Sequence, residues 1–294
     1  MISILIPVFN FDIISLVKEL SSQLSRLDVA GEILVFDDYS SPSYRELNNS
    51  VNNLESVVYK ELDRNYGRTA IRKLLASHAK YEWLLFLDSD TRILRPNFLG
   101  LYTSAFKTEF DLYVGGRIYP SLPAECNKRL HWKYGVKRES PKGNRTAFHT
   151  NNFCIKKNIF TQLDFPAFLN QYGHEDTWMG IELERMGKTM QYLDNTVEHA
   201  QIETTETFLK KTEDALQNLF SLKRVIDTKT LSNHVALFKS YCFIRNAGME
   251  FTIEFVYRSF KNWILQNLNS CNPSLTVFDF YRLYYLIQMA KRNP

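Results

Sequence analysis

Two aspartates separated by one residue, Asp88 and Asp90, are the strongest chemical signal in the sequence. They follow the apolar run Trp83–Leu87, whose lack of polar alternation predicts a strand buried on both faces of a parallel sheet. In an open α/β sheet, ligands bind at the carboxyl ends of the strands. Two carboxylates this close repel each other unless a cation lies between them, and a hard divalent cation that also holds substrate phosphates would suit such a pair. A polar turn after a strand is the alternative interpretation, because Asp and Ser are common in turns.

Basic residues lie where a helix does not favour them. Arg68, Arg72 and Lys73 fall at the start of a predicted helix over 69–79. Positive charge at a helix N-terminus opposes the helix dipole, so an anionic ligand near the strand ends would explain their position. Exposure of these side chains to solvent is the alternative, and for any single residue the sequence favours neither interpretation.

Two further acidic pairs stand at the ends of predicted elements. Asp37 and Asp38 follow a predicted strand over 32–36. Glu175 and Asp176 open a predicted helix. A carboxylate within hydrogen-bond reach of a hydroxyl can act as a general base, and the charge of one carboxylate raises the proton affinity of its neighbour. Simple capping of the helix, which the helix dipole also favours, is the alternative interpretation of the second pair.

The elements that carry these residues alternate in type. Strands are predicted over 2–8, 32–36, 57–62 and 82–87, and helices over 13–27, 42–54 and 69–79. This alternation predicts a parallel sheet with crossover helices, which places the protein in the α/β class. Later strands are predicted over 111–118, 148–155 and 189–199, the last as two short strands around a turn.

A long basic and polar stretch over 122–146 has no predicted element. A loop of this length inside a compact domain is usually functional or mobile. Its basic residues are Lys128, Arg129, Lys133, Lys137, Arg138, Lys142 and Arg145.

The character of the chain changes after residue 203, where glycine becomes rare and helical spacing dominates. We therefore predict a catalytic domain over 1–203 and a helical appendage over 204–294. The appendage could simply pack against the catalytic domain, or its aromatic and basic residues could form a membrane-surface face. These residues are Tyr257, Arg258, Phe260, Lys261, Trp263, Tyr281, Arg282, Tyr284, Tyr285, Lys291 and Arg292.

Composition sets broad limits on the function. The 294 residues, 45% of them apolar, suffice for one large domain or for a domain with an appendage. The net charge of +4 favours anionic partners only weakly and does not indicate a nucleic-acid-binding protein.

Cysteine usage and hydropathy bear on the location of the protein. The four cysteines, Cys126, Cys154, Cys242 and Cys271, form no Cys-x-x-Cys pair, and they predict free thiols in a reducing cytosol. No basic segment precedes a long apolar run, so we expect no signal peptide. No stretch of about 18 apolar residues predicts a transmembrane helix. We expect a cytoplasmic protein, with peripheral contact at the inner face of the membrane as a hypothesis for the appendage.

A series of short motifs occurs in a fixed order along the first 203 residues. The motifs are Pro7 and Asn10 at the end of the first strand; Asp37, Asp38, Tyr39 and Ser40; Asn65, Gly67, Ala70 and Arg72; Asp88 and Asp90; Gly173, Glu175 and Asp176; and His199. In this order and at these spacings they resemble the inverting glycosyltransferases of family 2, enzymes with the GT-A fold. That family's motifs are Asp-Asp-x-Ser, Asn-x-Gly-x-x-x-Ala-Arg, Asp-x-Asp and Gly-x-Glu-Asp. The sequence departs from them at Tyr39, where glycine is usual, and at Ala70 and Arg72, which are not adjacent.

The resemblance implies a binding site for a nucleotide sugar. By resemblance, Asp38 would bind the nucleobase, Arg72 would lie near the nucleotide, and Asp88 would contact the ribose. The whole nucleotide-sugar site would comprise Pro7, Asn10, Asp38, Arg68, Arg72, Asp88 and Ser89.

The resemblance also implies a metal site and a catalytic base. Asp90 would ligate Mn²⁺ or Mg²⁺, with His199 and Asp88 as further ligands. Asp176 would remove the proton from the acceptor hydroxyl, with Glu175 beside it.

The implied function is transfer of a hexosyl or N-acetylhexosaminyl group, with inversion, from a nucleotide-diphosphate sugar. The resemblance favours a UDP-sugar as donor, a hydroxyl of a glycan or lipid-linked acceptor, and a place in bacterial surface polysaccharide synthesis. A sugar nucleotidyltransferase is an alternative, but it would need a glycine-rich basic loop after the first strand, where the sequence has Pro7–Asn10. An inactive scaffold that binds carbohydrate or membrane is a second alternative, which the complete set of acidic residues disfavours. A dinucleotide-binding dehydrogenase is disfavoured because no Gly-x-Gly-x-x-Gly follows the first strand.

Overall fold

The computed structural model describes residues 1–140, 148–170 and 172–292. They group into two compact units. Unit 1 comprises Met1–Tyr119, Glu139–Pro166 and Glu182–Gln201. Unit 2 comprises Pro120–Arg138, Ala167–Ile181 and Ile202–Pro294. These units are groups of residues in contact rather than domains, so the predicted domain boundary after residue 203 stays a prediction.

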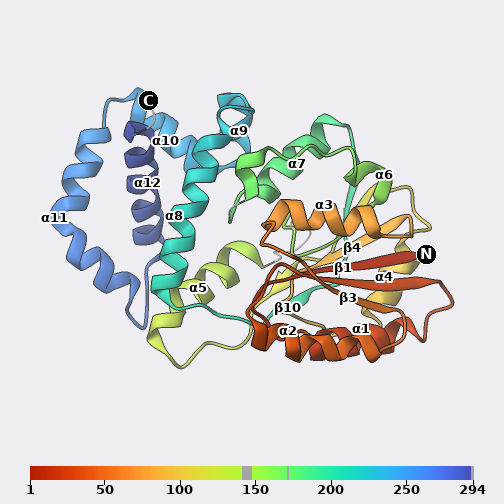
Figure 1. The fold of residues 1–294 in the computed structure, drawn as a ribbon. Helices are drawn as coiled ribbons and strands as arrows, with labels where there is room; N and C mark the ends of the chain where they lie inside the picture. Colours follow the sequence, from red (N-terminus) through yellow and green to blue (C-terminus); the bar gives the residue numbers. More distant parts are fainter. Residues whose placement is uncertain (141–147, 171, 293–294) are drawn as a thin grey trace. The chain divides into compact units, whose positions relative to one another are not determined.

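A mostly parallel sheet forms the centre of unit 1 (Figure 1). Among the described residues it has seven strands in the order β3-β2-β1-β4-β8-β6-β9. Strand β8 runs antiparallel to both of its neighbours, and the remaining pairs are parallel. The strands are β1 (Ile2–Val8), β2 (Gly31–Asp37), β3 (Val57–Glu61), β4 (Trp83–Leu87), β6 (Leu112–Val114), β8 (Asn152–Lys156) and β9 (Met190–Tyr192). The predicted α/β class is confirmed, and the first four predicted strands are correct to within one residue at each end.

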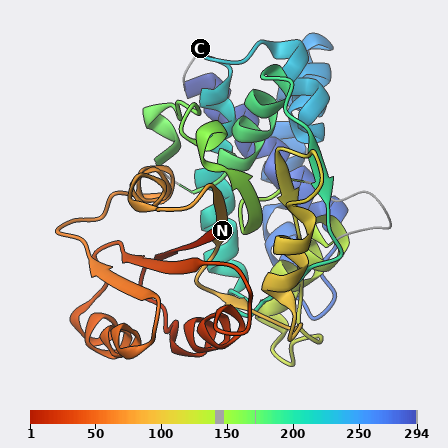
Figure 2. The same ribbon diagram turned by 90° about the vertical axis from the view of Figure 1, so that its right-hand side faces the viewer.

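Helices cover both faces of the parallel half of this sheet. Helices α1 (Ile14–Leu24) and α2 (Pro42–Asn49) lie on one face, and α3 (Arg68–His78) lies on the other (Figures 1 and 2). The short helices η1 (Ser50–Asn53), α4 (Phe98–Ala105) and α6 (Lys157–Phe160) complete the unit, and α7 (Glu175–Arg185) runs through residues of both units. This two-sided cover explains why β1 and β4 are apolar at nearly every position.

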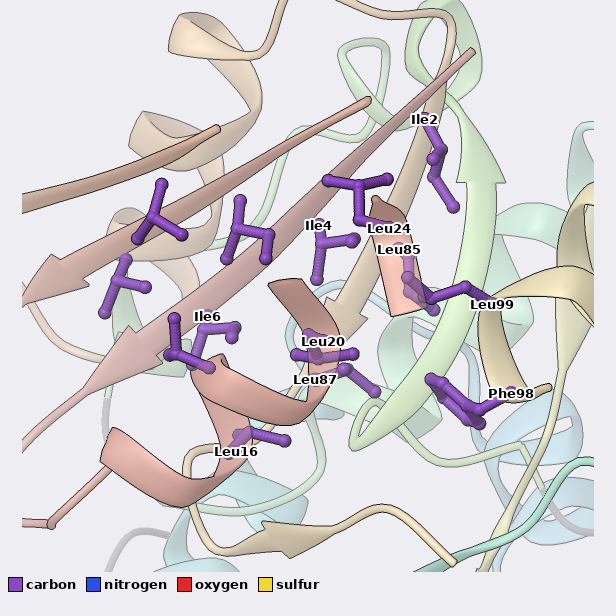
Figure 3. Packing of buried hydrophobic residues seen from close by; sticks show 14 of the residues in the cluster. Ile2, Ile4, Ile6, Leu16, Leu20, Leu24, Leu85, Leu87, Phe98 and Leu99 are labelled. Carbon is purple, nitrogen blue, oxygen red and sulfur yellow. The ribbon is translucent and has the colours of Figure 1, made fainter. Parts of the chain in front are cut away.

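The core of unit 1 lies between α1 and the sheet. Leu16, Leu20 and Leu24 recur every fourth residue and so share one face of α1. They pack against Ile4 of β1 and Leu85 of β4 in a cluster that is closed to solvent (Figure 3). Burial of this apolar layer, at about 25 cal/mol per Å² of surface removed from water, stabilises the packing of α1 on the sheet.

A second, small sheet departs from the sequence prediction. It contains β5 (Thr91–Arg92), β10 (Val197–His199) and β7 (Arg117–Ile118), in that order. The predicted strand over 111–118 is divided, because the chain leaves the large sheet after β6 and enters the small one at β7. The break falls at Gly115 and Gly116, and Gly116 has a φ of +71°, which glycine adopts readily.

Unit 2 is helical. It contains α5 (Arg129–Tyr134), α8 (Thr205–Leu222), α9 (Thr228–His234), α10 (Ala236–Asn246), α11 (Glu250–Leu268) and α12 (Leu275–Arg292), with short turns η2 (Cys126–Lys128) and η4 (Ala167–Asn170). Helix α12 packs between α8 and α11 (Figure 1). Their shared core includes Leu130, Phe208, Leu209, Tyr257, Ile264, Leu268, Phe278 and Tyr281. The predicted C-terminal helical region is therefore confirmed.

The predicted loop over 122–146 was wrong for its described part. Residues 126–139 form η2, α5 and the π-helical turn η3 (Gly135–Glu139). Leu130 anchors α5 in the core of unit 2, which the basic composition of this stretch concealed. The remainder, with Lys142 and Arg145, lies outside the described residues.

The prediction of four free thiols was also wrong. Cys126 and Cys271 form a disulfide, while Cys154 and Cys242 are free thiols. The pairing joins residues 145 positions apart, which no local sequence pattern could indicate. The argument from free thiols to a reducing compartment loses its basis. Within the described ranges, no helix has both the length and the apolarity needed to cross a membrane.

Gly115 offers a test of how tightly the two sheets are joined. A Cβ atom at this position would lie 2.3 Å from Asn152 Nδ2 and 2.4 Å from the carbonyl oxygen of Asn195. We expect Gly115→Ala to lower the free energy of unfolding by about 1–3 kcal/mol, the usual cost of overpacking a filled core. Urea denaturation followed by circular dichroism measures this.

Gly100→Ala is the matched control. Gly100 lies inside α4, and its added Cβ would meet nothing closer than 3.9 Å. Alanine should stabilise the protein there by up to about 1 kcal/mol, because glycine is unfavourable inside a helix. Equal destabilisation by the two substitutions would contradict the packing described for Gly115.

Candidate active site

Asp38 fastens the end of β2 to the turn that precedes α3. Its Oδ1 accepts the backbone N–H of Tyr66 at 2.6 Å, and its Oδ2 accepts that of Gly67 at 3.0 Å. Burial raises the pKa of Asp38, although these two amide hydrogen bonds act in the opposite direction. Asp38 therefore shapes the turn at the start of α3, and its predicted contact with a nucleobase stays a prediction.

Asp37 shapes the adjacent turn. The side chain is fully buried, and it accepts hydrogen bonds from the N–H of Ser40 at 2.7 Å and from the hydroxyl of Tyr59 at 3.0 Å. The Ser40 hydroxyl in turn accepts the N–H of Asn10 at 2.8 Å, and Asn10 Oδ1 accepts the N–H of Ser41 at the same distance. The ends of β1 and β2 are thus linked by side chains of the predicted site.

Left-handed backbone occurs at the ends of both strands. Asn10, after β1, has a φ of 49°, and Tyr39, after β2, has a φ of 68°. Tyr39 stands where the family motif has glycine, so the structure keeps the glycine-like conformation despite the side chain. The rings of Tyr39 and Phe9 are more than half exposed. Strain of this kind concentrates at functional sites. Pro7, which pairs with Phe36 within the sheet, precedes this turn.

Arg72 forms a nearly buried ion pair with Asp88. Arg72 Nη2 lies 2.7 Å from Asp88 Oδ1, and only 4% of the arginine side chain is exposed. Arg68 Nη2 is more distant, 3.6 Å from Asp88 Oδ2. The arginines at the start of α3 thus have an anionic partner within the chain. Asp88 therefore faces two guanidinium groups, one close and one more distant.

Asp90 and His199 form the second polar pair. Asp90 Oδ2 lies 3.2 Å from His199 Nδ1, and the carbonyl oxygen of Asp90 accepts the N–H of Ala200 at 2.8 Å. Burial opposes ionisation of Asp90, but the hydrogen bond from His199 and the charges of His199, Arg117 and Arg68 outweigh it and lower the pKa of the carboxyl. Asp90 is therefore ionised at neutral pH.

The small sheet creates the Asp90–His199 pair. Strands β5 and β10 pair in antiparallel register, with His199 opposite Thr91, the residue after Asp90. Ser89 lies half-buried in the turn between the two aspartates. Within the described part of the chain, no three His, Cys, Asp or Glu side chains are grouped so as to hold a metal ion by themselves. Asp88, held by arginine, stays a predicted ligand.

Three residues beside His199 were missed by the sequence analysis. The ring of Tyr119 packs edge-on against the imidazole, with ring centroids 5.3 Å apart. Tyr119 donates its hydroxyl hydrogen to Glu139, and Arg117 Nη2 pairs with the same carboxylate at 2.8 Å. Arg117 follows a diglycine break, which is a weak signal for a functional turn. Glu139 belongs to no motif, so only its position in space connects it with the site.

The predicted base lies in unit 2, at the start of α7. Glu175 is buried and Asp176 is half-buried. Asp176 Oδ1 accepts the N–H of Thr177 at 2.7 Å. Both acidic residues lie in the first turn of α7, where the helix dipole favours a carboxylate, and the catalytic role of Asp176 stays a prediction.

The turn that presents this acidic pair is rigidly packed. Gly173 has a φ of +99°, and an added Cβ would lie 2.4 Å from that of Ala215 in α8. The amide of Asn218 donates a hydrogen bond to the Gly173 carbonyl at 3.0 Å. Burial lowers the pKa of His174, so its ring is neutral at pH 7 beside Asp176.

Comparison with known proteins decides the family. A family model described as glycosyl transferase family 2 matches residues 3–177, more than half of the chain. The chain belongs to glycosyl transferase family 2. The resemblance drawn from the motifs is therefore confirmed, and with it the assignment of the chain as a glycosyltransferase. No curated protein sequence matches the chain.

Solved structures of glycosyltransferases share its GT-A fold. A mannosyltransferase from Pyrobaculum calidifontis in complex with GDP-mannose and Mn²⁺ is 14% identical, with a TM-score of 0.56 over 99% of this chain and 86% of that one. Glucosyl-3-phosphoglycerate synthase from Mycobacterium tuberculosis, in complex with Mn²⁺, UDP-glucose and phosphoglyceric acid, is 14% identical, with a TM-score of 0.52 over 75% and 79% of the two chains. At these identities the likeness shows the fold alone.

The unequal burial of the two arginines yields a prediction about this family 2 site. Arg72→Met leaves the carboxylate of Asp88 without its close partner. The free energy of unfolding should fall by about 3 kcal/mol, the lower end of the range for a broken buried pair, because a fifth of the Asp88 side chain is exposed. Urea denaturation provides the measurement.

Arg68→Met serves as the control, because it removes the same charge at a distance of 3.6 Å and from a side chain that is 34% exposed. Its cost should stay below about 1 kcal/mol, as for exposed ion pairs. If the two variants are equally stable, the Arg72–Asp88 pair does not hold the end of β4.

Proposed function

We propose that this family 2 enzyme transfers a hexosyl or N-acetylhexosaminyl group from a nucleotide-diphosphate sugar to a hydroxyl of a glycan or lipid-linked acceptor, with inversion. The observation that carries the proposal is the Asp90–His199 pair at 3.2 Å, with Asp90 two residues after Asp88, the arginine-paired carboxylate at the end of β4. A place in bacterial surface polysaccharide synthesis follows from the family resemblance.

The chemistry of this pair fits Mn²⁺ or Mg²⁺. A cation that also binds substrate phosphates needs only one or two protein carboxylates, since diphosphate and water oxygens complete its coordination. Asp90 supplies an ionised carboxylate, and His199 supplies a ring nitrogen beside it. When bound, the cation would act as a Lewis acid that stabilises the departing diphosphate. Two of the similar structures hold Mn²⁺ with a nucleotide sugar, which supports this assignment.

The remaining charges suit an anionic donor. Arg68 and Arg72 place two guanidinium groups beside Asp88 at the end of β4, where we propose that the diphosphate of the donor binds. Because Arg72 is almost fully buried, this charge is fixed before any ligand arrives, and a preorganised charge costs no reorganisation when diphosphate binds. We propose a UDP-sugar as donor, as in the synthase complex with UDP-glucose, whereas the similar mannosyltransferase holds GDP-mannose.

Asp176 is the proposed general base. It would accept the proton of the acceptor hydroxyl as that oxygen attacks the anomeric carbon. Its position in the first turn of α7, beside Glu175 and in the segment that resembles the family's base motif, supports this role. Direct displacement by the acceptor would invert the anomeric configuration.

Metal dependence tests the donor site. Chelation should abolish transfer, and Mn²⁺ or Mg²⁺ should restore it. Asp90→Asn should lower the transfer rate at least about 100-fold, because the Lewis-acid contribution amounts to several kcal/mol. It should also remove the rise in melting temperature that UDP and Mn²⁺ together give the parent protein.

Asp28→Asn, at an exposed position of unit 1, should change neither measurement. Full activity of the parent in excess chelator would refute the metal assignment. Absence of transfer under every donor and metal condition would favour an inactive scaffold.

A substitution at Asp176 tests the catalytic base. Asp176→Asn keeps the shape of the side chain and removes the proton acceptor. The rate of transfer should fall by roughly 10²–10⁴, the usual contribution of general base catalysis, while donor affinity should stay within about threefold of the parent. Timed transfer assays measure the rate, and titration calorimetry with the UDP-sugar measures the donor affinity.

Glu175→Gln distinguishes the two acidic residues. The base proposal requires its transfer rate to exceed that of Asp176→Asn by at least about tenfold. Near-normal transfer by Asp176→Asn would show that another group acts as the general base. A product of retained configuration, detected by NMR, would exclude single displacement.

A further inference from the structure

Helix α11 is apolar on two opposite faces. Tyr257, Ile264 and Leu268 are buried in the core of unit 2. On the other side of the helix, four large aromatic side chains are exposed, namely Phe251 (75%), Phe255 (63%), Phe260 (56%) and Trp263 (55%). At 100° per residue these four span about half of the helix circumference. We call them the outer face of α11.

An outer face of this kind requires an explanation. A helix that is apolar all round is normally buried on all sides, yet α11 packs on α12 and lies at the outside of its unit (Figure 1). Met249, which directly precedes α11, is also exposed, and so is Phe243 of α10 (68%). Exposed apolar patches rarely occur on a protein without a partner for them.

The exposed charges of α10 and α11 have one sign. Over 236–268, a fully described stretch, the exposed charged side chains are Lys239, Arg245, Arg258 and Lys261. The same stretch contains two acidic residues, of which Glu250 is half-buried and Glu254 is buried. Glu254 is buried against α12, where it pairs with Lys291 and accepts a hydrogen bond from Gln288 at 2.8 Å. The surface of α10 and α11 is therefore aromatic and basic.

The aromatic residues of α12 do not belong to this surface. Tyr257 stacks on Tyr284 with ring centroids 3.6 Å apart, and Tyr281 is buried. The Arg282 guanidinium lies over the rings of Tyr134 and Phe278. The aromatic residues of α12 therefore help to form the core of unit 2, and the exposed aromatic residues lie on α11.

We propose that the outer face of α11 docks on an anionic membrane surface. Aromatic rings favour the membrane interface, and an amphipathic helix with basic flanks binds there through apolar burial and attraction to anionic lipids. A second copy of the chain fits less well, because a two-fold interface would bring the same basic residues face to face. The inference is independent of the proposed transfer reaction, since docking can be measured without a sugar substrate.

Co-sedimentation with vesicles tests the proposal. Vesicles of phosphatidylcholine with about one third phosphatidylglycerol should retain the protein at low salt, whereas phosphatidylcholine alone should not. Salt should release it, because attraction between exposed charges is screened beyond about 10 Å at 0.1 M. No retention by anionic vesicles at low salt would overturn the proposal, and equal retention by neutral vesicles would overturn its electrostatic part.

Paired variants separate the apolar from the charged contribution. Phe251→Ser with Phe255→Ser should weaken binding at least about tenfold per side chain, while Leu47→Ser with Val58→Ser, two exposed apolar positions of unit 1, should not. Arg258→Glu with Lys261→Glu should weaken binding at least about 30-fold, the effect of losing two basic charges alone. Lys18→Glu with Lys107→Glu, which has the same net charge, should weaken it far less. Equal effects of a pair and its control would overturn the assignment to α11.

Trp263 provides a direct probe. Trp83 and Trp178 are buried, and Trp132 is half-buried and donates its ring N–H to the Pro120 carbonyl, so the most exposed indole is that of Trp263. Its fluorescence should shift to shorter wavelength on anionic vesicles and be quenched by brominated lipid. Trp263→Phe should keep vesicle binding and lose the shift. Self-association of the parent without lipid, abolished by the Phe251 and Phe255 substitutions, would instead identify a second copy as the partner.

Discussion

The Arg72–Asp88 ion pair joins the start of α3 to the end of β4, and the donor side of the site depends on it. Without Arg72, Asp88 would have only the more distant and more exposed Arg68 as its counter-charge at the end of an apolar strand, where desolvation makes a poorly paired charge costly. Arg72 can reach it because α3 begins immediately after Gly67, and that start is fixed by the two amide hydrogen bonds to Asp38. A chain of local contacts thus runs from the end of β2 through α3 to the turn that contains Asp90.

The four aspartates near this edge have different kinds of hydrogen-bond and ion-pair partners. Asp37 and Asp38 are satisfied by neutral donors, Asp88 by arginine, and Asp90 by an imidazole. Only the last arrangement leaves a carboxylate beside a second group that can also ligate a cation. Three of these aspartates, Asp37, Asp38 and Asp88, therefore have partners that hold the local structure. Asp90 alone among the four is paired with a residue that suits a metal ion, His199. In unit 2, Asp176 lies in the first turn of α7 beside a neutral His174, and close packing at Gly173 fixes the preceding turn.

Much of this could be predicted from residues alone. The apolar runs that became β1 and β4 have no polar interruption, and a parallel strand covered by helices on both faces requires this pattern. The Asp88 and Asp90 pair was visible because it ends such a run. By contrast, β5 and β7 have two residues each, too few for any periodicity to appear. The pairing of β10 with both joins residues that are 80 positions apart or more, and the contact between Asp90 and His199 depends on it.

The sequence by itself determined the α/β class, the order of the motifs, the family and the position of the acidic residues at strand ends. These features are local, because each depends on the spacing of residues within a few turns or one strand. Only the tertiary structure decided which partner each charge meets. It paired Cys126 with Cys271, placed Arg117, Tyr119 and Glu139 beside His199, and divided the aromatic residues of α11 and α12 between a core and a surface. Long-range partners are chosen by the packing of whole elements, and no spacing along the chain records that choice.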